Sequence, residues 1–169
     1  MYALRDEIKP FIRGYFNTIP SLLSLENLSF WEHFHNRGGW NKTHETGWFL
    51  CQTRLMLVQE RDQELWLAPF VARSWLNDGM TIRVENSPTA FGPVSYRIHS
   101  AVDRDVIEAT VEPPAMRPPE RIVLRLRHPA AKPIRAVTIG GKPHADFDAK
   151  AETIRLAPAA GPFTLVVRY

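Results

Sequence analysis

The uneven distribution of proline is the feature that most constrains how this chain can fold. Fourteen prolines are many for 169 residues, and most of them follow residue 87. Proline disrupts helix interiors and central strands but is accepted at strand edges and in turns. The second half of the chain is therefore expected to consist of short strands joined by turns.

The pattern of apolar residues agrees with this expectation. From residue 64 onward, apolar and polar side chains alternate with a period of two, as in strands that bury one face. Turn residues such as Pro113-Pro114 and Gly140-Gly141 separate the segments, and no helical segment intervenes. The sequence predicts a mainly β fold, an antiparallel β-sandwich of about seven to eight strands. After a first strand near residue 64, the expected strands are 80–86, 93–101, 106–112, 121–127, 134–139, 152–156 and 163–168.

The first third of the chain has helical periodicity instead. Residues 3–23 repeat apolar side chains at helical spacing, and Pro20 is expected to break or kink this helix. A second helix should begin at 43–46, and its buried face is predicted to consist of Trp48, Cys51, Leu55 and Val58, with Phe49 and Met56 adjoining it. These features indicate an α-helical hairpin in residues 1–63 ahead of a sandwich domain in residues 64–169.

Charge and composition exclude several classes of protein. The net charge is only +3, and the basic residues are interspersed with acidic ones, unlike the basic stripe of a nucleic-acid-binding protein. No apolar stretch approaches the ~20 residues of a membrane span. The N-terminus lacks a signal-peptide pattern, so a cytoplasmic location is the default expectation. The single cysteine, Cys51, rules out an internal disulfide framework.

One polar and aromatic cluster stands out as a candidate site. It comprises the predicted sugar-binding residues Trp40, Asn41, His44, Glu45 and Trp48. The tryptophans could stack on a sugar face, while Asn41 and His44 bond hydroxyl groups and Glu45 acts as a hydrogen-bonding or acid–base carboxylate. The alternative is structural, with Asn41 capping the second helix and Glu45 complementing its dipole. No metal or cofactor is expected, because the histidines lack partners at metal-binding spacing.

The order of several motifs resembles the C-terminal portion of bacterial six-hairpin, (α/α)6-barrel glycoside-hydrolase-like proteins. The motifs are KPFIRGYFN at 9–17, FWEHF at 30–34, NKTHETGWFLCQTRLML at 41–57, LWLAPF at 65–70 and FGPVSY at 91–96. The resemblance implies a last helical hairpin followed by the β-sandwich that braces such a barrel. It also implies that five further hairpins, with at least one catalytic carboxylate, belong to a missing N-terminal barrel domain.

Three interpretations of function follow. The first is a structural and sugar-contacting fragment of a glycoside-hydrolase-like protein that is not catalytic alone, with a carbohydrate or the missing barrel as partner. The second is a stand-alone sandwich module that binds carbohydrate or protein. The third, a small complete enzyme, is disfavoured because Glu45 is a weak catalytic candidate and a glycosidase needs two acids. The wide apolar stripe of the hairpin also allows a homo-oligomer formed through it.

Overall fold

The computed structural model describes residues 2–169. The chain divides into two compact units, and the boundary along the sequence lies between Met56 and Leu57. The sequence placed this boundary between residues 63 and 64. The structure divides the chain earlier because β3 (Val58–Arg61) pairs with β4 (Glu64–Leu67) and so joins the sandwich. Residues 58–63 therefore form an edge strand and its turn.

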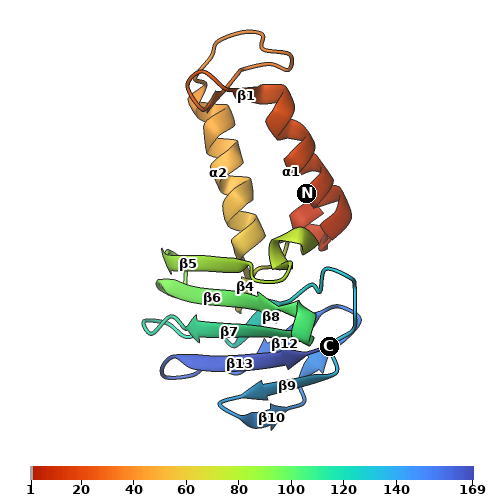
Figure 1. The fold of residues 1–169 in the computed structure, drawn as a ribbon. Helices are drawn as coiled ribbons and strands as arrows, with labels where there is room; N and C mark the ends of the chain where they lie inside the picture. The colour runs from red at the N-terminus through yellow and green to blue at the C-terminus, as the bar shows by residue number, and fades with distance from the viewer. Residues whose placement is uncertain (1) are drawn as a thin grey trace. The chain divides into compact units, whose positions relative to one another are not determined.

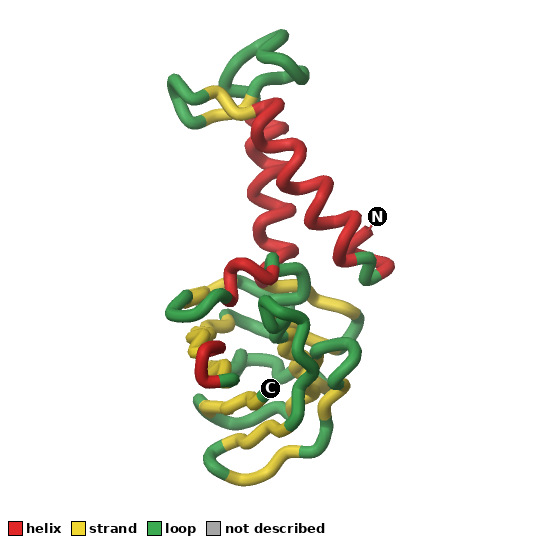
Figure 2. Tube along the Cα trace, turned by 45° about the vertical axis from the view of Figure 1, so that its right-hand side comes forward, coloured by secondary structure: helices red, strands yellow, loops and turns green. Residues whose placement is uncertain are grey.

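The first unit is a helical hairpin, as predicted. After a short 3-10 turn, η1 (Tyr2–Arg5), helices α1 (Ile8–Leu22) and α2 (Thr43–Leu57) run side by side (Figures 1 and 2). The ring of Phe49 in α2 stacks on that of Tyr15 in α1, with 5.6 Å between centroids. The hydroxyl groups of Tyr15 and Thr53 lie 2.9 Å apart and share a hydrogen bond. This seam of aromatic and polar contacts joins the two helices.

Two sequence expectations about these helices were wrong. Helix α1 continues through Pro20 and ends at Leu22, because a proline this close to a helix end removes only one of the last hydrogen bonds. The predicted buried face of α2 is also incorrect, since Trp48 and Cys51 are both exposed. The helical periodicity therefore predicted the helix correctly but not which of its side chains are buried.

An irregular segment connects the helices. It begins with a two-stranded ribbon of β1 (Leu23–Ser24) and β2 (Ser29–Phe30) and continues to residue 42 without regular structure. His35, Asn36 and Asn41 adopt left-handed backbone conformations, which fold this loop tightly.

The second unit consists of two sheets around one core. The six-stranded sheet has the order β10-β9-β13-β7-β6-β5, and the five-stranded sheet has the order β11-β12-β8-β4-β3 (Figure 1). The remaining elements are η2 (Arg73–Leu76), β5 (Thr81–Ser87), β6 (Val94–Ala101), η3 (Val102–Arg104), β7 (Val106–Glu112), β8 (Arg121–Arg125), β9 (Ala136–Ile139), β10 (Lys142–His144), β11 (Phe147–Asp148), β12 (Thr153–Leu156) and β13 (Phe163–Arg168). The mainly β, sandwich fold class is confirmed.

Strand pairing departs from the prediction in two respects. All pairs are antiparallel except β4 with β8, which run parallel with Leu65 opposite Ile122. The sheets also contain more strands than expected, because β3, β10 and β11 lie in segments for which no strand was predicted. In β10, Pro143 is accommodated because the strand lies at the edge of its sheet.

Alternating side chains from both sheets form the core. In β7 the inward positions Ile107, Ala109 and Val111 are buried, while the residues between them are more accessible to solvent. The same alternation was expected for the strand near 121–127 and is absent there, because β8 is covered on both faces. Strand β13 lies between β7 and β9, so the last strand of the chain occupies the middle of the six-stranded sheet.

Candidate functional site

The five predicted sugar-binding residues all lie in the helical unit, in the loop before α2 and in its first two turns. Trp40 and Trp48 expose 62% and 60% of their surface, and the side chain of His44 exposes 70%. The Glu45 side chain is different, with only 13% exposed. The structure thus brings these residues into one region but gives them unequal access to a ligand.

Hydrogen bonds within the loop explain its conformation. A carboxylate oxygen of Glu32 accepts a hydrogen bond from the backbone N–H of Gly39 at 3.1 Å, and the other lies 3.1 Å from the ammonium group of Lys42. The Gly39 bond, followed by the Lys42 contact, lowers the pKa of the Glu32 carboxyl. Gly38 has a positive φ of 82°, and a Cβ atom there would lie 2.8 Å from the same carboxylate. Glu32 therefore organises the loop that carries Trp40.

Asn41 also has a partner within the loop. Its side-chain oxygen accepts a hydrogen bond from the Ser29 hydroxyl at 3.0 Å, and its backbone φ is 65°. This contact ties the residues before α2 to strand β2. The side-chain oxygen of Asn41 is thus already engaged in positioning the loop.

A cavity of about 150 Å³ lies between α1, α2 and β2. It is lined by Tyr15, Thr18, Ile19, Leu22, Phe30, Glu45, Trp48, Phe49 and Gln52. Of the predicted site residues, Glu45 and Trp48 line this cavity, whereas Trp40, Asn41 and His44 do not. Sequence reasoning did not foresee the contribution of α1, because the first helix had been interpreted as a packing element.

Glu45 is the only carboxylate among the residues that line this cavity. Its Oε2 atom is buried and, within residues 2–169, accepts no hydrogen bond. The Nδ1 atom of His44 lies 2.9 Å from this Oε2 atom, close enough for an ion pair. The described residues also contain no group of three or more potential metal ligands among histidine, cysteine, aspartate and glutamate.

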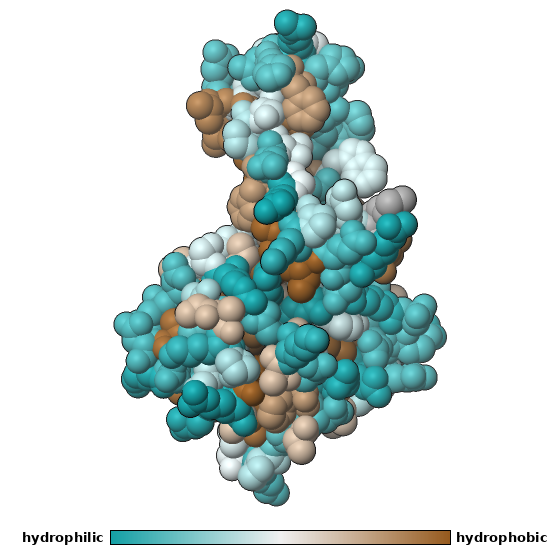
Figure 3. Space-filling model, turned by 90° about the vertical axis from the view of Figure 1, so that its right-hand side faces the viewer, coloured by the Kyte–Doolittle hydropathy of each residue, from teal (hydrophilic) through white to brown (hydrophobic). Residues whose placement is uncertain are grey.

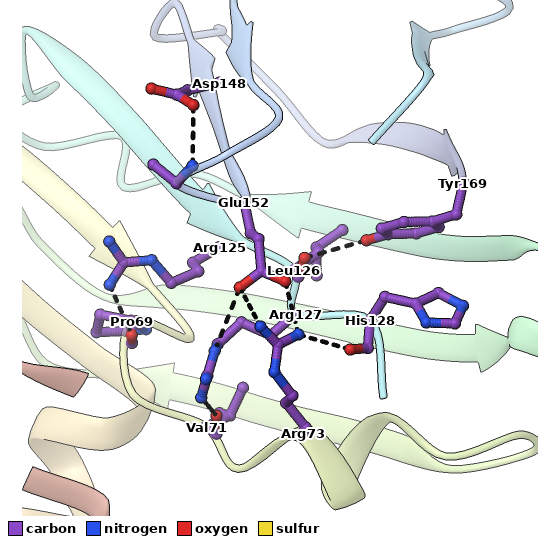
Figure 4. A network of polar contacts seen from close by, with 11 residues as sticks. Pro69, Val71, Arg73, Arg125, Leu126, Arg127, His128, Asp148, Glu152 and Tyr169 are labelled. Atoms are coloured by element: carbon purple, nitrogen blue, oxygen red, sulfur yellow. Dashed lines mark hydrogen bonds and ion pairs between the residues drawn. The ribbon is translucent and has the colours of Figure 1, made fainter. Parts of the chain in front are cut away.

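A second polar cluster, in the sandwich, was not predicted. Glu152 lies between two guanidinium groups (Figure 4), accepting hydrogen bonds from Arg73 at 2.6 and 2.9 Å and lying 3.5 Å from Nε of Arg127. Arg73 also donates to the backbone oxygen of His128, and Arg127 donates to that of Val71. Burial, followed by the charge of Arg73, lowers the pKa of Arg127. The alternating arginines of the LRLRH segment at 124–128 could have indicated this cluster. The segment was instead interpreted as a strand with one face exposed to solvent.

All these contacts connect parts of the sandwich to one another. Nearby, Arg125 is buried, donates to the backbone oxygen of Pro69 and lies 5.1 Å from the Trp66 ring centre. The cluster therefore fastens the segment after β4 to β8 and to the turn before β12. Its role in the structure is architectural.

Comparisons with known proteins give a limited result. No family model and no curated protein matches the sequence. In the described part of the chain, no helix is both long and apolar enough to cross a membrane.

Solved structures with some similarity include three carbohydrate-related or uncharacterised proteins. The cycloalternan-forming enzyme from Listeria monocytogenes, solved with a pentasaccharide substrate, has a TM-score of 0.44 and 10% identity over 62% of this chain. An uncharacterised protein from the same species has a TM-score of 0.44 and 9% identity, again over 62%. A glycoside hydrolase has a TM-score of 0.41 and 12% identity over 91%.

This chain spans 10% of each of the two Listeria proteins and 27% of the glycoside hydrolase. One of these similar structures is thus that of a glycoside hydrolase, and all three TM-scores are too low to carry an argument about this chain.

Proposed function

We propose that this chain is a structural part of a glycoside-hydrolase-like protein, in which the helical hairpin packs against further α-helices and the sandwich braces them. One observation supports this proposal most directly. Nine of the eleven large apolar side chains that are exposed within residues 2–169 belong to the helical unit. They are Tyr2, Leu4, Phe16, Leu25, Leu28, Phe34, Trp40, Trp48 and Leu50.

The sandwich provides an internal comparison. It is the larger unit, yet its exposed large apolar side chains within residues 57–169 are only Met80 and Met116. Figure 3 shows brown, apolar side chains at several places along the helical hairpin on one face of the molecule. Soluble units rarely leave so much apolar surface uncovered unless another surface packs on it.

The covering partner is best matched by other helices. Phe16 on α1 and Trp48 and Leu50 on α2 are exposed on regular helices, where ridges of side chains fit the grooves of a neighbouring helix. A helix that is apolar on more than one face is characteristic of the interior of a helical assembly. Further hairpins of a barrel would provide such an environment.

A sugar contact forms the second part of this proposal. Trp40, in the loop organised by Glu32, and His44 and Trp48, in the first two turns of α2, have exposed rings close together in the sequence. Aromatic surfaces with a few polar groups are typical of ligand sites. We do not propose that this chain hydrolyses glycosides by itself. Glycoside hydrolysis uses a pair of carboxylates, and Glu45 is the one carboxylate that lines its cavity.

The alternative is that the sandwich is a binding module in its own right. A polar hollow of about 440 Å³ lies along β5, β6 and β7, and its lining includes Arg83, Glu85, Arg97 and Glu112. This surface could bind a hydrophilic ligand. Its lining has no exposed aromatic ring, since Tyr96 is buried, so it lacks a platform on which a sugar could stack.

Association of the hairpin tests the main proposal. We expect the chain to associate with a five-hairpin helical barrel of a glycoside-hydrolase-like protein when the two are co-expressed as separate polypeptides. The Leu50→Ser variant should weaken this association, whereas Met116→Ser, which changes an even more exposed apolar residue of the sandwich, should not. Equal behaviour of the two variants, or glycoside hydrolysis by the purified monomer, would contradict the proposal.

A further inference from the structure

We infer that the cavity between α1 and α2 binds an organic ammonium cation. This inference goes beyond the proposed sugar contact, because it concerns a different ligand and a cavity that excludes Trp40 and His44. It depends on three properties of the cavity, namely its aromatic lining, its one carboxylate and its size.

Aromatic rings dominate the lining. Tyr15, Phe30, Trp48 and Phe49 all contribute to it. Phe49 joins these rings into one cluster, since its centroid lies 5.6 Å from that of Tyr15 and 4.9 Å from that of Phe30. The face of an aromatic ring attracts a cation, and groups of such rings are the usual receptor for ammonium ligands.

Glu45 adds a negative charge to this aromatic environment. Its side chain is 13% exposed, and the buried Oε2 atom accepts no hydrogen bond within residues 2–169, although Nδ1 of the exposed His44 ring lies 2.9 Å away. A buried carboxylate oxygen without a donor is costly, because it has lost water without replacing it. A cation in the cavity would restore that interaction, whereas a neutral apolar molecule would not.

Size and polarity distinguish an ammonium ligand from a sugar in this cavity. The volume is about 150 Å³, and the lining is mostly apolar, with Glu45, Gln52 and Thr18 as the main polar side chains. A sugar carries a hydroxyl group on most of its carbons and would leave several of them without partners there. An alkylammonium ion needs only a carboxylate, aromatic faces and contacts for its methylene or methyl groups.

The ammonium group could come from a free quaternary ammonium compound or from a lysine side chain of a covering helix. Three probes, applied to the full 169-residue chain, separate these sources: tetramethylammonium, n-butylammonium as a mimic of the lysine end, and n-butanol as the neutral control. Binding is followed through the indole N–H resonance of Trp48 in NMR titrations. Preference for tetramethylammonium indicates a free ligand, and preference for n-butylammonium indicates a lysine.

For ligands of this size, the better cation should bind with a dissociation constant on the order of 1–10 mM. It should bind roughly tenfold more tightly than n-butanol, because only the cation interacts with Glu45 and the ring faces. Glu45→Gln should remove this preference while leaving the weak binding of n-butanol unchanged. Glu85→Gln, an exposed carboxylate of the sandwich, is the matched control and should retain full cation binding.

Trp48→Leu provides a second test that should not perturb folding, because this side chain is largely exposed. With the Gln52 side-chain amide as the reporter, it should weaken cation binding about threefold to tenfold, the part contributed by one ring. Equal binding of n-butanol and the cations, or full cation binding by Glu45→Gln, would overturn the inference. Such a result would leave the helix-packing proposal intact, since that proposal is tested by association.

Discussion

At the scale of single residues, Glu152 is the clearest example of a side chain whose role depends on its neighbours. It is nearly buried and accepts hydrogen bonds from Arg73 while pairing with Arg127. The side chain of Arg127 is only 9% exposed, so its charge has little access to water. A buried cation of this kind needs a nearby counter-charge. Glu152 supplies it and thereby allows Arg127 to lie buried just after the end of β8.

Replacing Glu152 by glutamine should therefore destabilise the sandwich by about 2–4 kcal/mol, because Arg127 would remain buried without its counter-charge. Urea unfolding monitored by circular dichroism gives this value. Glu85→Gln breaks the exposed pair with Arg83 and should cost less than about 1 kcal/mol. Similar losses in the two variants would show that the Glu152 pair has no special importance.

His128 predicts a dependence of stability on pH. Its ring is buried against Tyr169, and Nδ1 accepts a hydrogen bond from the backbone N–H of Ala130 at 3.0 Å. Burial, followed by the charge of Lys132, lowers the pKa of His128. In the unfolded chain the pKa returns to about 6.5. Below that pH the unfolded state binds more protons than the folded state, so the free energy of unfolding decreases as the pH falls toward the folded pKa.

The His128→Gln variant should therefore lose less stability than the parent between pH 7 and pH 5, because the titrating group has been removed. Above pH 7 the histidine is neutral in both states, and the pH dependence of the two proteins should coincide. Urea midpoints measured at half-unit intervals provide the comparison. If the free energy of unfolding decreased equally in both proteins below pH 6.5, His128 would be excluded as the source of the pH dependence.

At the scale of elements, α2 shows that a sequence can predict a helix without predicting which of its side chains are buried. The sequence correctly placed its start within residues 43–46, but its predicted buried residues Trp48 and Cys51 are exposed in this chain. The actual contact with α1 involves Phe49 and Thr53 instead. Both sets are apolar or small, so the pattern alone could not select the face that meets α1.

Two substitutions in α2 test this assignment. Trp48→Ala should change the free energy of unfolding by less than about 1 kcal/mol, as expected for an exposed side chain. Phe49→Ala should cost about 2–4 kcal/mol, because it removes the ring that contacts both Tyr15 and Phe30. Thermal unfolding of the helical signal measures both. The opposite ranking would mean that Trp48 lies in the seam between the helices.

The strands were easier to predict than the candidate site. The segments proposed near 81, 94, 106, 121 and 163 all became strands, because proline and glycine mark their ends. Short pieces such as β10 and β11 escaped detection, since two or three residues show no periodicity. The cavity at Glu45 could not be foreseen because it needs Tyr15 and Phe30, which are distant in the sequence.

At the scale of the whole molecule, apolar exposure is concentrated in the smaller unit. If the hairpin is covered in its working assembly, its exposed tryptophans Trp40 and Trp48 should become inaccessible on association. Acrylamide quenching of tryptophan fluorescence should then decrease about twofold relative to the isolated chain. The Trp40→Phe and Trp48→Phe variants identify which ring accounts for the change. Unaltered quenching upon association would place the interface elsewhere.

The central position of β13 has a consequence for biosynthesis. Residues 163–168 pair with β7 on one side and β9 on the other, so neither neighbour can complete its hydrogen bonds until these residues are available. A nascent chain still threaded through the ribosomal exit tunnel would hold this segment back while the earlier strands had already emerged. The sandwich should therefore reach its protease-resistant state only after residues 163–168 have left the tunnel, and chaperones can bind the incompletely paired strands β7 and β9 until then.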